Sequence, residues 1–180
     1  MSRVLLASSA SVSVYKACDL ASKLTQDGHT VRTVLTARAA ELISPQLFEA
    51  VTGEAAYTSE FDATRRGAMD HIDLGDFAEA LVVAPASADL IARLAHGLAG
   101  DLVTTSVLAL APEVPRLLCP AMNPKMLASR PVERNLGQLR EDGWHVIEPD
   151  EGHMACGVEG KGRLPEPATI VARLREVLGQ

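Results

Sequence analysis

The segment 119–126 concentrates side chains that can bind a small polar ligand. It sets the carboxamide of Asn123 among two methionine thioethers and two prolines, directly after the apolar run 114–118. An amide at the carboxyl end of a strand in an open parallel sheet points into the crevice where such sheets bind ligands. It offers donor and acceptor atoms to a substrate carboxylate or amide. The alternative, which these residues alone favour, is that Asn123 caps a helix beginning at Pro124.

Small polar residues stand at three more expected strand ends, each directly before an expected helix: 8–11, Thr36 and 87–89. Free backbone N–H groups and the positive end of a helix dipole make such positions ready anion sites. The first turn lacks the Gly-x-Gly-x-x-Gly of a dinucleotide fingerprint. The carboxyl ends of parallel strands lie along one edge of the sheet, which we call the rim. Three turns with Ser or Thr hydroxyls on this rim predict a phosphate pocket for a mononucleotide. Taken singly, each hydroxyl is also explained as a helix cap.

Apolar strands and amphipathic helices alternate along the chain and must position these groups. Strands are expected at 3–7, 30–35, 80–84, 114–119 and 144–147, and helices at 13–27, 39–43, 45–51, 89–99, 101–110, 131–142 and 168–178. This alternation predicts an α/β fold, a single-domain Rossmann-like (flavodoxin-like) open parallel sheet with helices on both faces, spanning 1–180. Two segments fall outside it: a loop over 57–70 that delivers His71, and a Gly-rich, mobile flap at 150–166.

Composition narrows the class of protein. With 180 residues, 47% of them hydrophobic and 22% charged, the chain resembles an ordinary soluble globular protein with a full core. A net charge of −6 without a Lys/Arg cluster gives no sign of nucleic acid or an anionic membrane as partner. No apolar run approaches the roughly 18–20 residues of a membrane span. The three cysteines are widely spaced and odd in number, which argues against a disulfide framework and predicts a cytoplasmic location. The histidines lack the spacing of metal ligands, so no metal site is predicted.

Four segments resemble the motifs of the homo-oligomeric flavin-containing cysteine decarboxylases. Residues 85–89, Pro-Ala-Ser-Ala-Asp, are similar to the family's Pro-Ala-Ser-Ala-Asn-Thr motif, and 120–126 to its Pro-x-Met-Asn-x-x-Met motif. Residues 71–74 resemble the segment with the active-site histidine, and 155–163 the substrate flap. The resemblance spans about 4–170 in the family's order and is closest to phosphopantothenoylcysteine decarboxylase, of coenzyme A biosynthesis. A related branch decarboxylates the C-terminal cysteine of lantibiotic-type precursor peptides.

The resemblance implies an FMN-dependent carboxy-lyase that converts 4′-phosphopantothenoylcysteine to 4′-phosphopantetheine. It implies His71 and Cys156 as catalytic residues. The implied substrate-binding residues are Met122, Asn123, Ala155 and Gly157. The implied cofactor-binding residues are Ser9, Ala10, Ser11, Val12, Thr36, Ser87, Ala88, Asp89 and Ala121. It also implies self-association into trimers or trimer-built dodecamers.

The chemistry explains why a flavin is needed. Direct decarboxylation of a cysteine carboxylate would leave a carbanion without an electron sink. Oxidation of the thiol to a thioaldehyde supplies that sink, and it needs a hydride acceptor that no side chain provides. His71 suits proton transfer at neutral pH. The thiol of Cys156 can return a proton in the coenzyme A branch, whereas the peptide branch releases the ene-thiol and does not need it.

Three positions depart from the family pattern: Ala10 replaces a glycine, Asp89-Leu90 replaces Asn-Thr, and Leu127 replaces a tryptophan. A carboxylate at Asp89 would alter the electrostatics beside a flavin. An apolar stripe on the helix 89–99 fits self-association, with core burial as the alternative; it comprises Leu90, Ile91, Leu94, Ala95 and Leu98.

Two other functions on this fold remain open. One is a flavin-binding regulatory subunit that inhibits a phosphatase, and the other is a prenyl transferase that modifies flavin. The first could keep the flavin rim and lose Asn123 or Cys156, and the second would not require the 120–126 motif. Because His71, Asn123 and Cys156 are all present, the decarboxylase is preferred.

Overall fold

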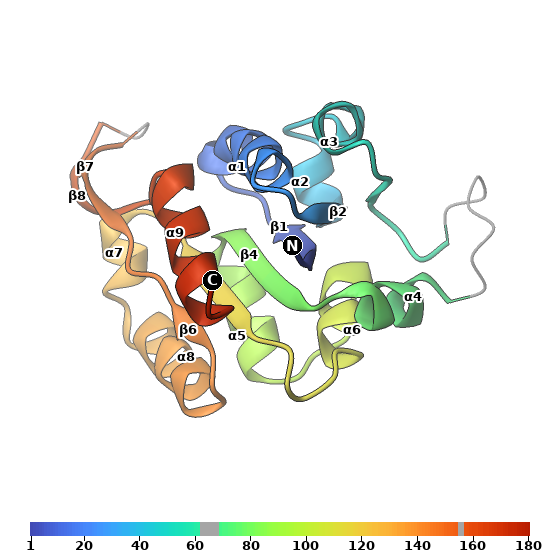
Figure 1. Cartoon of the computed structure of the whole chain (residues 1–180). Coiled ribbons are helices and arrows are strands. Elements are labelled where there is room, and N and C mark those ends of the chain that lie inside the picture. Colours follow the sequence, from blue (N-terminus) through green and yellow to red (C-terminus); the bar gives the residue numbers. More distant parts are fainter. Residues whose placement is uncertain (62–68, 155–156) are drawn as a thin grey trace.

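The computed structural model describes residues 1–61, 69–154 and 157–180, and Figure 1 shows a central sheet between two layers of helices. Six parallel strands form the sheet in the order β3-β2-β1-β4-β5-β6. Their bounds are β1 (Arg3–Ser8), β2 (Thr30–Leu35), β3 (Ala56–Tyr57), β4 (Ala80–Ala86), β5 (Arg116–Pro120) and β6 (His145–Val146). The chain runs outward from β1 to β3 and crosses back to β4 beside β1. This switch point is where open α/β sheets leave a crevice.

The central strands are buried on both faces. All seven residues of β4 are buried, and so are the last five residues of β1. Side chains that point alternately up and down must then all be apolar or small, because each face of the sheet carries a helix layer. This is why the sequence shows continuous apolar runs, and the predicted fold class is confirmed.

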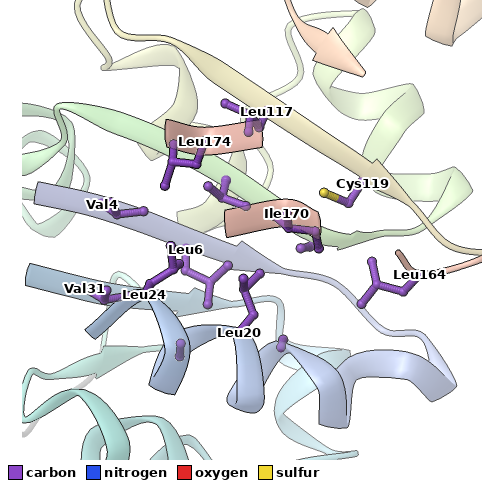
Figure 2. Close-up of a cluster of buried hydrophobic side chains, with 14 of the residues drawn as sticks. Val4, Leu6, Leu20, Leu24, Val31, Leu117, Cys119, Leu164, Ile170 and Leu174 are labelled. Atoms are coloured by element: carbon purple, nitrogen blue, oxygen red, sulfur yellow. The ribbon is translucent and has the colours of Figure 1, made fainter. Parts of the chain in front are cut away.

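One helix layer consists of α1 (Tyr15–Gln26), α3 (Pro45–Thr52) and α9 (Pro167–Val177). In Figure 2, Leu20 and Leu24 of α1 and Ile170 and Leu174 of α9 lie against the sheet. All four side chains are fully buried. Burial of each contributes about 1.5–3 kcal/mol to stability, so this layer anchors α1, which begins at the predicted site.

The other layer consists of α4 (Asp70–Phe77), α5 (Ala88–Ala95), α6 (Leu102–Leu108) and α8 (Arg130–Glu141). On α5, Leu90 and Ile91 are fully buried, and Leu94 and Ala95 pack against the same cluster. Only Leu98, beyond the end of the helix, is strongly exposed. Packing within the chain therefore accounts for most of the apolar stripe, as the core-burial alternative has it.

Short elements complete the connections: η1 (Val12–Val14), α2 (Ala37–Ala40) and α7 (Pro124–Leu127). Within the described residues, no helix is long and apolar enough to cross a membrane.

The helix α4, in which His71 is the second residue, was not predicted; it overlaps the predicted loop over 57–70 only at Asp70, and residues 62–68 of that loop lie outside the described residues. The sequence hides this helix because Gly75, a poor helix former, stands in its middle. The glycine has a packing role: a Cβ there would lie 2.7 Å from the carbonyl oxygen of Ala109. Close contact between α4 and the end of α6 overrides the local propensity.

A two-stranded antiparallel hairpin, β7 (Asp150–His153) and β8 (Glu159–Arg163), lies within the segment 150–166 that the sequence predicts to be a Gly-rich, mobile flap. Gly152, Gly160 and Gly162 have φ values of +144°, +153° and +156°. Other residues rarely adopt such angles, so these glycines permit the hairpin. Glycine also has a low strand propensity, and the sequence pattern therefore reads as a breaker.

Candidate active site

The carboxyl ends of β2, β1, β4 and β5 lie side by side along one rim of the sheet. Thr36 follows β2, Ser9 follows β1, Ser87 follows β4 and Ala121 follows β5. The strand order thus gathers residues that are up to 112 positions apart in the chain (9 to 121) into one row. All of them were expected to contact the cofactor.

Three hydroxyls on this rim cap the elements that follow. The bonds are Ser13 N to Ser11 Oγ at 3.4 Å, Ala39 N to Thr36 Oγ1 at 3.2 Å, and Leu90 N to Ser87 Oγ at 3.3 Å. The capping alternative therefore holds at each position. A cap uses the hydroxyl oxygen as acceptor, whereas an anion would accept the hydroxyl hydrogen, so the two roles are compatible. The helix α2, which Thr36 caps, has only four residues, so at this position the hydroxyl matters more for anion binding than the helix dipole.

Ser9 links the end of β1 to the turn between β4 and α5. Its hydroxyl donates to the carbonyl of Pro85 at 2.9 Å and accepts the N–H of Ser87 at 2.7 Å. Its own N–H also bonds to Pro85 O, at 3.0 Å. The residue is 2% exposed, and its hydroxyl fixes the β4–α5 turn.

A cavity of about 380 Å³ opens beside the rim, between the start of α1, the segment after β5 and the hairpin. It unites the predicted cofactor residues Ser11, Val12 and Ala121 with the predicted substrate residues Met122 and Asn123. The remaining lining residues are Ser13, Tyr15, Lys16, His153, Met154, Gly162, Arg163 and Leu164. Among the described residues, no group of three or more His, Cys, Asp or Glu side chains is arranged to hold a metal ion.

A second cavity, of about 440 Å³, lies on the far side of the segment 120–127, between α7, α8 and the hairpin. None of the predicted site residues lines it. Leu127, which stands where the family pattern has a tryptophan, is one of its walls. The predicted chemistry therefore belongs to the smaller cavity.

Asn123 is both a helix cap and a wall of the smaller cavity. Its Oδ1 accepts the N–H of Lys125 at 2.9 Å, and Pro124 is the first residue of α7. The cap engages the amide oxygen, whereas a substrate carboxylate would be bound by the amide N–H groups. The two readings of Asn123 from the sequence are thus compatible, because they use different atoms.

The hairpin is joined directly to this segment. The N–H of Met122 donates to the carbonyl of Gly162 at 3.1 Å. A Cβ on Gly162 would lie 2.2 Å from Met122 O, so only glycine fits this approach. Ala155 and Cys156 lie outside the described residues. Gly157, next to them, is exposed, donates its N–H to Met154 O at 2.9 Å, and does not line the cavity.

His71 lies elsewhere in the chain. It is on α4, which packs against β1 and α6. Figure 1 shows α4 and the hairpin at opposite ends of the molecule. Its side chain is 26% exposed, with Nδ1 4.0 Å from Oε2 of Glu60. His71 does not line the cavity that contains Asn123. One copy of the chain therefore does not bring these two residues together.

The departures at Asp89 and Ala10 are accommodated. Asp89 forms an ion pair with Arg93 at 2.8 Å, and Arg93 bonds to Asp101, the cap of α6, at 2.6 Å. The charge that would disturb a flavin is thus offset only in part, because Asp89 is exposed to solvent and shares the guanidinium of Arg93 with Asp101. Ala10 replaces a glycine without strain, because no described residue other than glycine has a positive φ. Ala88, next to Asp89, opens α5.

The two cysteines within the described residues are structural. Cys119 is fully buried in the core shown in Figure 2, and this burial raises the pKa of its thiol. Burial also raises the pKa of Cys18, with the charge of Asp19 adding to the effect. Both thiols stay protonated near neutral pH, so neither is an activated nucleophile.

A family model described as Flavoprotein matches residues 1–179. The chain belongs to the flavoprotein family. This flavoprotein is 44% identical over 168 residues to the coenzyme A biosynthesis bifunctional protein CoaBC of Bacillus subtilis (strain 168), covering 93% of the chain and 41% of that protein. It is 36% identical over 176 residues to a probable phosphopantothenoylcysteine decarboxylase of Streptococcus mutans, with 98% of both chains covered. The chain spans about two fifths of the length of the CoaBC relatives it matches.

Solved structures show the same fold over nearly the whole flavoprotein. A PPC decarboxylase mutant in complex with pantothenoylaminoethenethiol matches with a TM-score of 0.90 and 31% identity, covering 99% of both chains. The FMN-dependent cysteine decarboxylase SpaF matches with a TM-score of 0.81 and 32% identity, covering 99% of this chain and 98% of the other.

Several residues of the flavoprotein's cavity are not expected from the sequence. Tyr15 and Lys16 line it one turn beyond the hydroxylic loop, and Arg163 lines it from the end of β8. The helical spacing from Ser11 to Lys16 and the position of Arg163 in the flap motif are the only local signals. The structure identifies both cations as site residues because α1 and the hairpin line the same cavity.

Proposed function

We propose that this flavoprotein is an FMN-dependent decarboxylase of 4′-phosphopantothenoylcysteine, with 4′-phosphopantetheine as the product. The cavity that joins Ser11 and Val12, at the β1 end of the rim, to Asn123 and the hairpin carries the proposal, because a cofactor and a substrate carboxylate must meet there. Relatives named for this step or for coenzyme A biosynthesis cover 93–98% of the chain. We further propose that residues 1–180 act as one domain in the cytoplasm, with 150–166 as its flap.

The residues of the rim fit FMN. Thr36, Ser11 and Ser87 on adjacent strand ends can donate hydroxyl hydrogens to one phosphate, and no glycine repeat prepares a second phosphate site. Val12 and Ala121 provide small apolar surfaces in the adjoining cavity. When bound, FMN supplies the hydride acceptor that oxidation of the substrate thiol requires.

The substrate side follows from the cavity walls. The amide N–H groups of Asn123 would hold the cysteine carboxylate, beside the thioether of Met122. The hairpin, bonded to Met122 through Gly162, would exclude water from the reacting carbons. His71 would accept the thiol proton. Cys156 would deliver the proton that must accompany the return of the hydride to the ene-thiol, so that the saturated thiol is formed with no net oxidation.

His71 reaches the substrate, in this proposal, from a neighbouring copy of the chain in a trimer. The support is that His71 lies outside the cavity of its own chain, next to the exposed apolar side chains of Met69 and Ile72. Exposed apolar side chains beside a catalytic group favour burial against a partner.

Mixed oligomers test this sharing. His71→Asn and Asn123→Asp oligomers should each be inactive, whereas co-expression should restore part of the activity, because some sites then receive both intact residues. Mixed oligomers that stay inactive, or an active monomer in sedimentation equilibrium, would refute the shared site.

Mass spectrometry of the product tests the function. With 4′-phosphopantothenoylcysteine we expect the loss of CO₂ alone. The Cys156→Ser variant should instead release an ene-thiol that is lighter by two hydrogens, because a serine hydroxyl is a far weaker acid than a thiol. An unchanged substrate with wild-type protein would overturn the proposal.

A second candidate is a decarboxylase of C-terminal cysteines in peptides, since the chain is also similar to SpaF, which is described as an FMN-dependent cysteine decarboxylase and not as an enzyme of coenzyme A biosynthesis. In that case the wild-type protein itself would release the ene-thiol, and Cys156→Ser would change little. A flavin-binding regulatory subunit is the remaining alternative, and it would bind FMN without any reduction of the flavin by either substrate.

A further inference from the structure

The cavity beside the rim is lined by positive charges, although the chain as a whole is negatively charged. The chain has a net charge of −6, yet Lys16 and Arg163 line the cavity. Among the described residues, no Asp or Glu side chain belongs to its walls. A cavity with two cations and no acid favours an anionic ligand.

The two cations share one carboxylate. Nζ of Lys16 lies 2.6 Å from Oε1 of Glu166, and Nη2 of Arg163 lies 3.6 Å from the same oxygen. The side chain of Lys16 is 13% exposed, whereas that of Glu166 is 58% exposed. Two positive charges against one solvated negative charge leave a net charge of +1 beside the cavity, and the longer contact leaves Arg163 the more weakly held cation.

The hairpin makes room for this arginine. A Cβ on Gly152 of β7 would lie 2.8 Å from Nη1 of Arg163 and 3.2 Å from its Cδ. The absence of a side chain at Gly152 thus lets the guanidinium lie across the neighbouring strand, along the wall that faces Lys16. The side chain of Arg163 is 40% exposed, and its close approach to Gly152 places the guanidinium against β7.

We propose that Arg163, with Lys16 beside it, binds the 4′-phosphate of the substrate and selects phosphorylated substrates over unphosphorylated ones. This rests on the proposed function. A phosphate monoester carries about 1.5–2 negative charges at neutral pH and matches the two-pronged donor geometry of a guanidinium. Asn123 lines the same cavity and would take the cysteine carboxylate at the other end of the substrate. The C-terminal cysteine of a peptide substrate carries no phosphate monoester for this cation pair.

The phosphate of FMN is the other anion that could occupy this position. The hydroxyls after β1, β2 and β4 already form a row for it. Titration of FMN against the apoprotein separates the two sources. Arg163→Met should leave the FMN dissociation constant within about twofold, because the arginine serves the substrate; a tenfold or larger rise would assign it to the cofactor and overturn the proposal.

The main experiment compares kcat/KM for 4′-phosphopantothenoylcysteine and for unphosphorylated pantothenoylcysteine. We expect wild-type holoprotein to prefer the phosphorylated substrate. Arg163→Met should lower kcat/KM for that substrate by about 10- to 100-fold, the range of a charge-assisted hydrogen bond, and leave the unphosphorylated substrate within about twofold. Arg163→Lys should restore part of the preference, because it returns the charge without the planar fork.

Lys161→Met is the matched control, since Lys161 is also a cation of β8 but faces the second cavity. It should keep the preference for the phosphorylated substrate. Equal losses on both substrates in Arg163→Met would show a merely structural arginine, and a wild-type protein without any preference would also refute the inference. Absence of turnover with either substrate would instead contradict the proposed function.

Discussion

The strand ends and the hairpin face each other across the cavity and are held in different ways. The strand ends belong to the sheet core, and the buried hydroxyls of Ser8 and Ser9 tie β1 to the carbonyls of Ala84 and Pro85 at 2.7 and 2.9 Å. Among the described residues, the hairpin is bonded to the segment after β5 by the backbone hydrogen bond from Met122 N–H to Gly162 O, and Lys161 adds an exposed ion pair with Glu148.

This difference separates two tasks. Displacing the strand ends requires breaking buried hydrogen bonds and core packing, so the cofactor side is as stable as the fold. The hairpin has few apolar contacts and open backbone, and such segments open at low free-energy cost. We therefore expect changes on the hairpin side to alter substrate chemistry without unfolding the protein, and changes behind the rim to alter stability and cofactor binding together.

The largest effect on the substrate side is expected from Asn123→Asp. The new carboxylate would repel the substrate carboxylate, a repulsion of several kcal/mol in a desolvated site, so reduction of the flavin should slow by about 100-fold or more. FMN content should not change. Stopped-flow absorbance of the flavin after mixing with substrate measures this.

Asn123→Ser separates the two roles of this residue. Serine is as good a helix cap as asparagine but lacks the amide donors, so the melting temperature should stay within about 2 °C while flavin reduction is still lost. Full activity in Asn123→Ser would show that the residue only caps α7.

Gly162→Ala should have the next largest effect. A methyl group 2.2 Å from Met122 O, at φ +156°, forces the hairpin away from the substrate segment. Strain of about 1–3 kcal/mol predicts a 10- to 100-fold lower kcat/KM with FMN still bound. Gly179→Ala, at φ +68° near the end of the chain with no atom within 4 Å, is the control for backbone strain alone. Equal activity in both variants would contradict a positioning role for Gly162.

The strand ends and the hairpin also differ in how well the sequence predicts them. The rim was predictable because its signals are local: apolar runs mark the strands, and hydroxylic turns mark their ends. The hairpin strands were not, because their glycines have positive φ values and close contacts that exist only once β7, β8 and the segment after β5 pack together. The pairing of Lys16 with Glu166 joins residues 150 positions apart, and no periodicity reports it. For the same reason the sequence motif of His71 gives its chemistry but not its distance from Asn123.

Ser9→Ala should show the opposite pattern. The N–H of Ser87 would lose its 2.7 Å acceptor behind the rim, and an unsatisfied buried N–H costs about 1–3 kcal/mol. We expect a lower melting temperature and weaker FMN binding together, with normal kcat for the protein that retains FMN. Ser129→Ala, an exposed serine that donates to Met126 O, is the control. A stable variant with unchanged FMN affinity would refute the role of Ser9 as a brace.

The smallest effect is expected where the hairpin meets α8. Hydrogen bonding from Lys161, and then the charge of Arg140, hold the pKa of Glu148 below its usual value. Since the folded-state pKa is the lower one, the stabilisation is fully present above the unfolded pKa of about 4.3 and is lost as the pH falls through the folded value. These pairs are exposed, so Glu148→Gln should cost less than about 1 kcal/mol at pH 7. The difference in melting temperature from wild type should shrink below about pH 4, whereas a difference that persists there would mean that Glu148 acts by packing and not by charge.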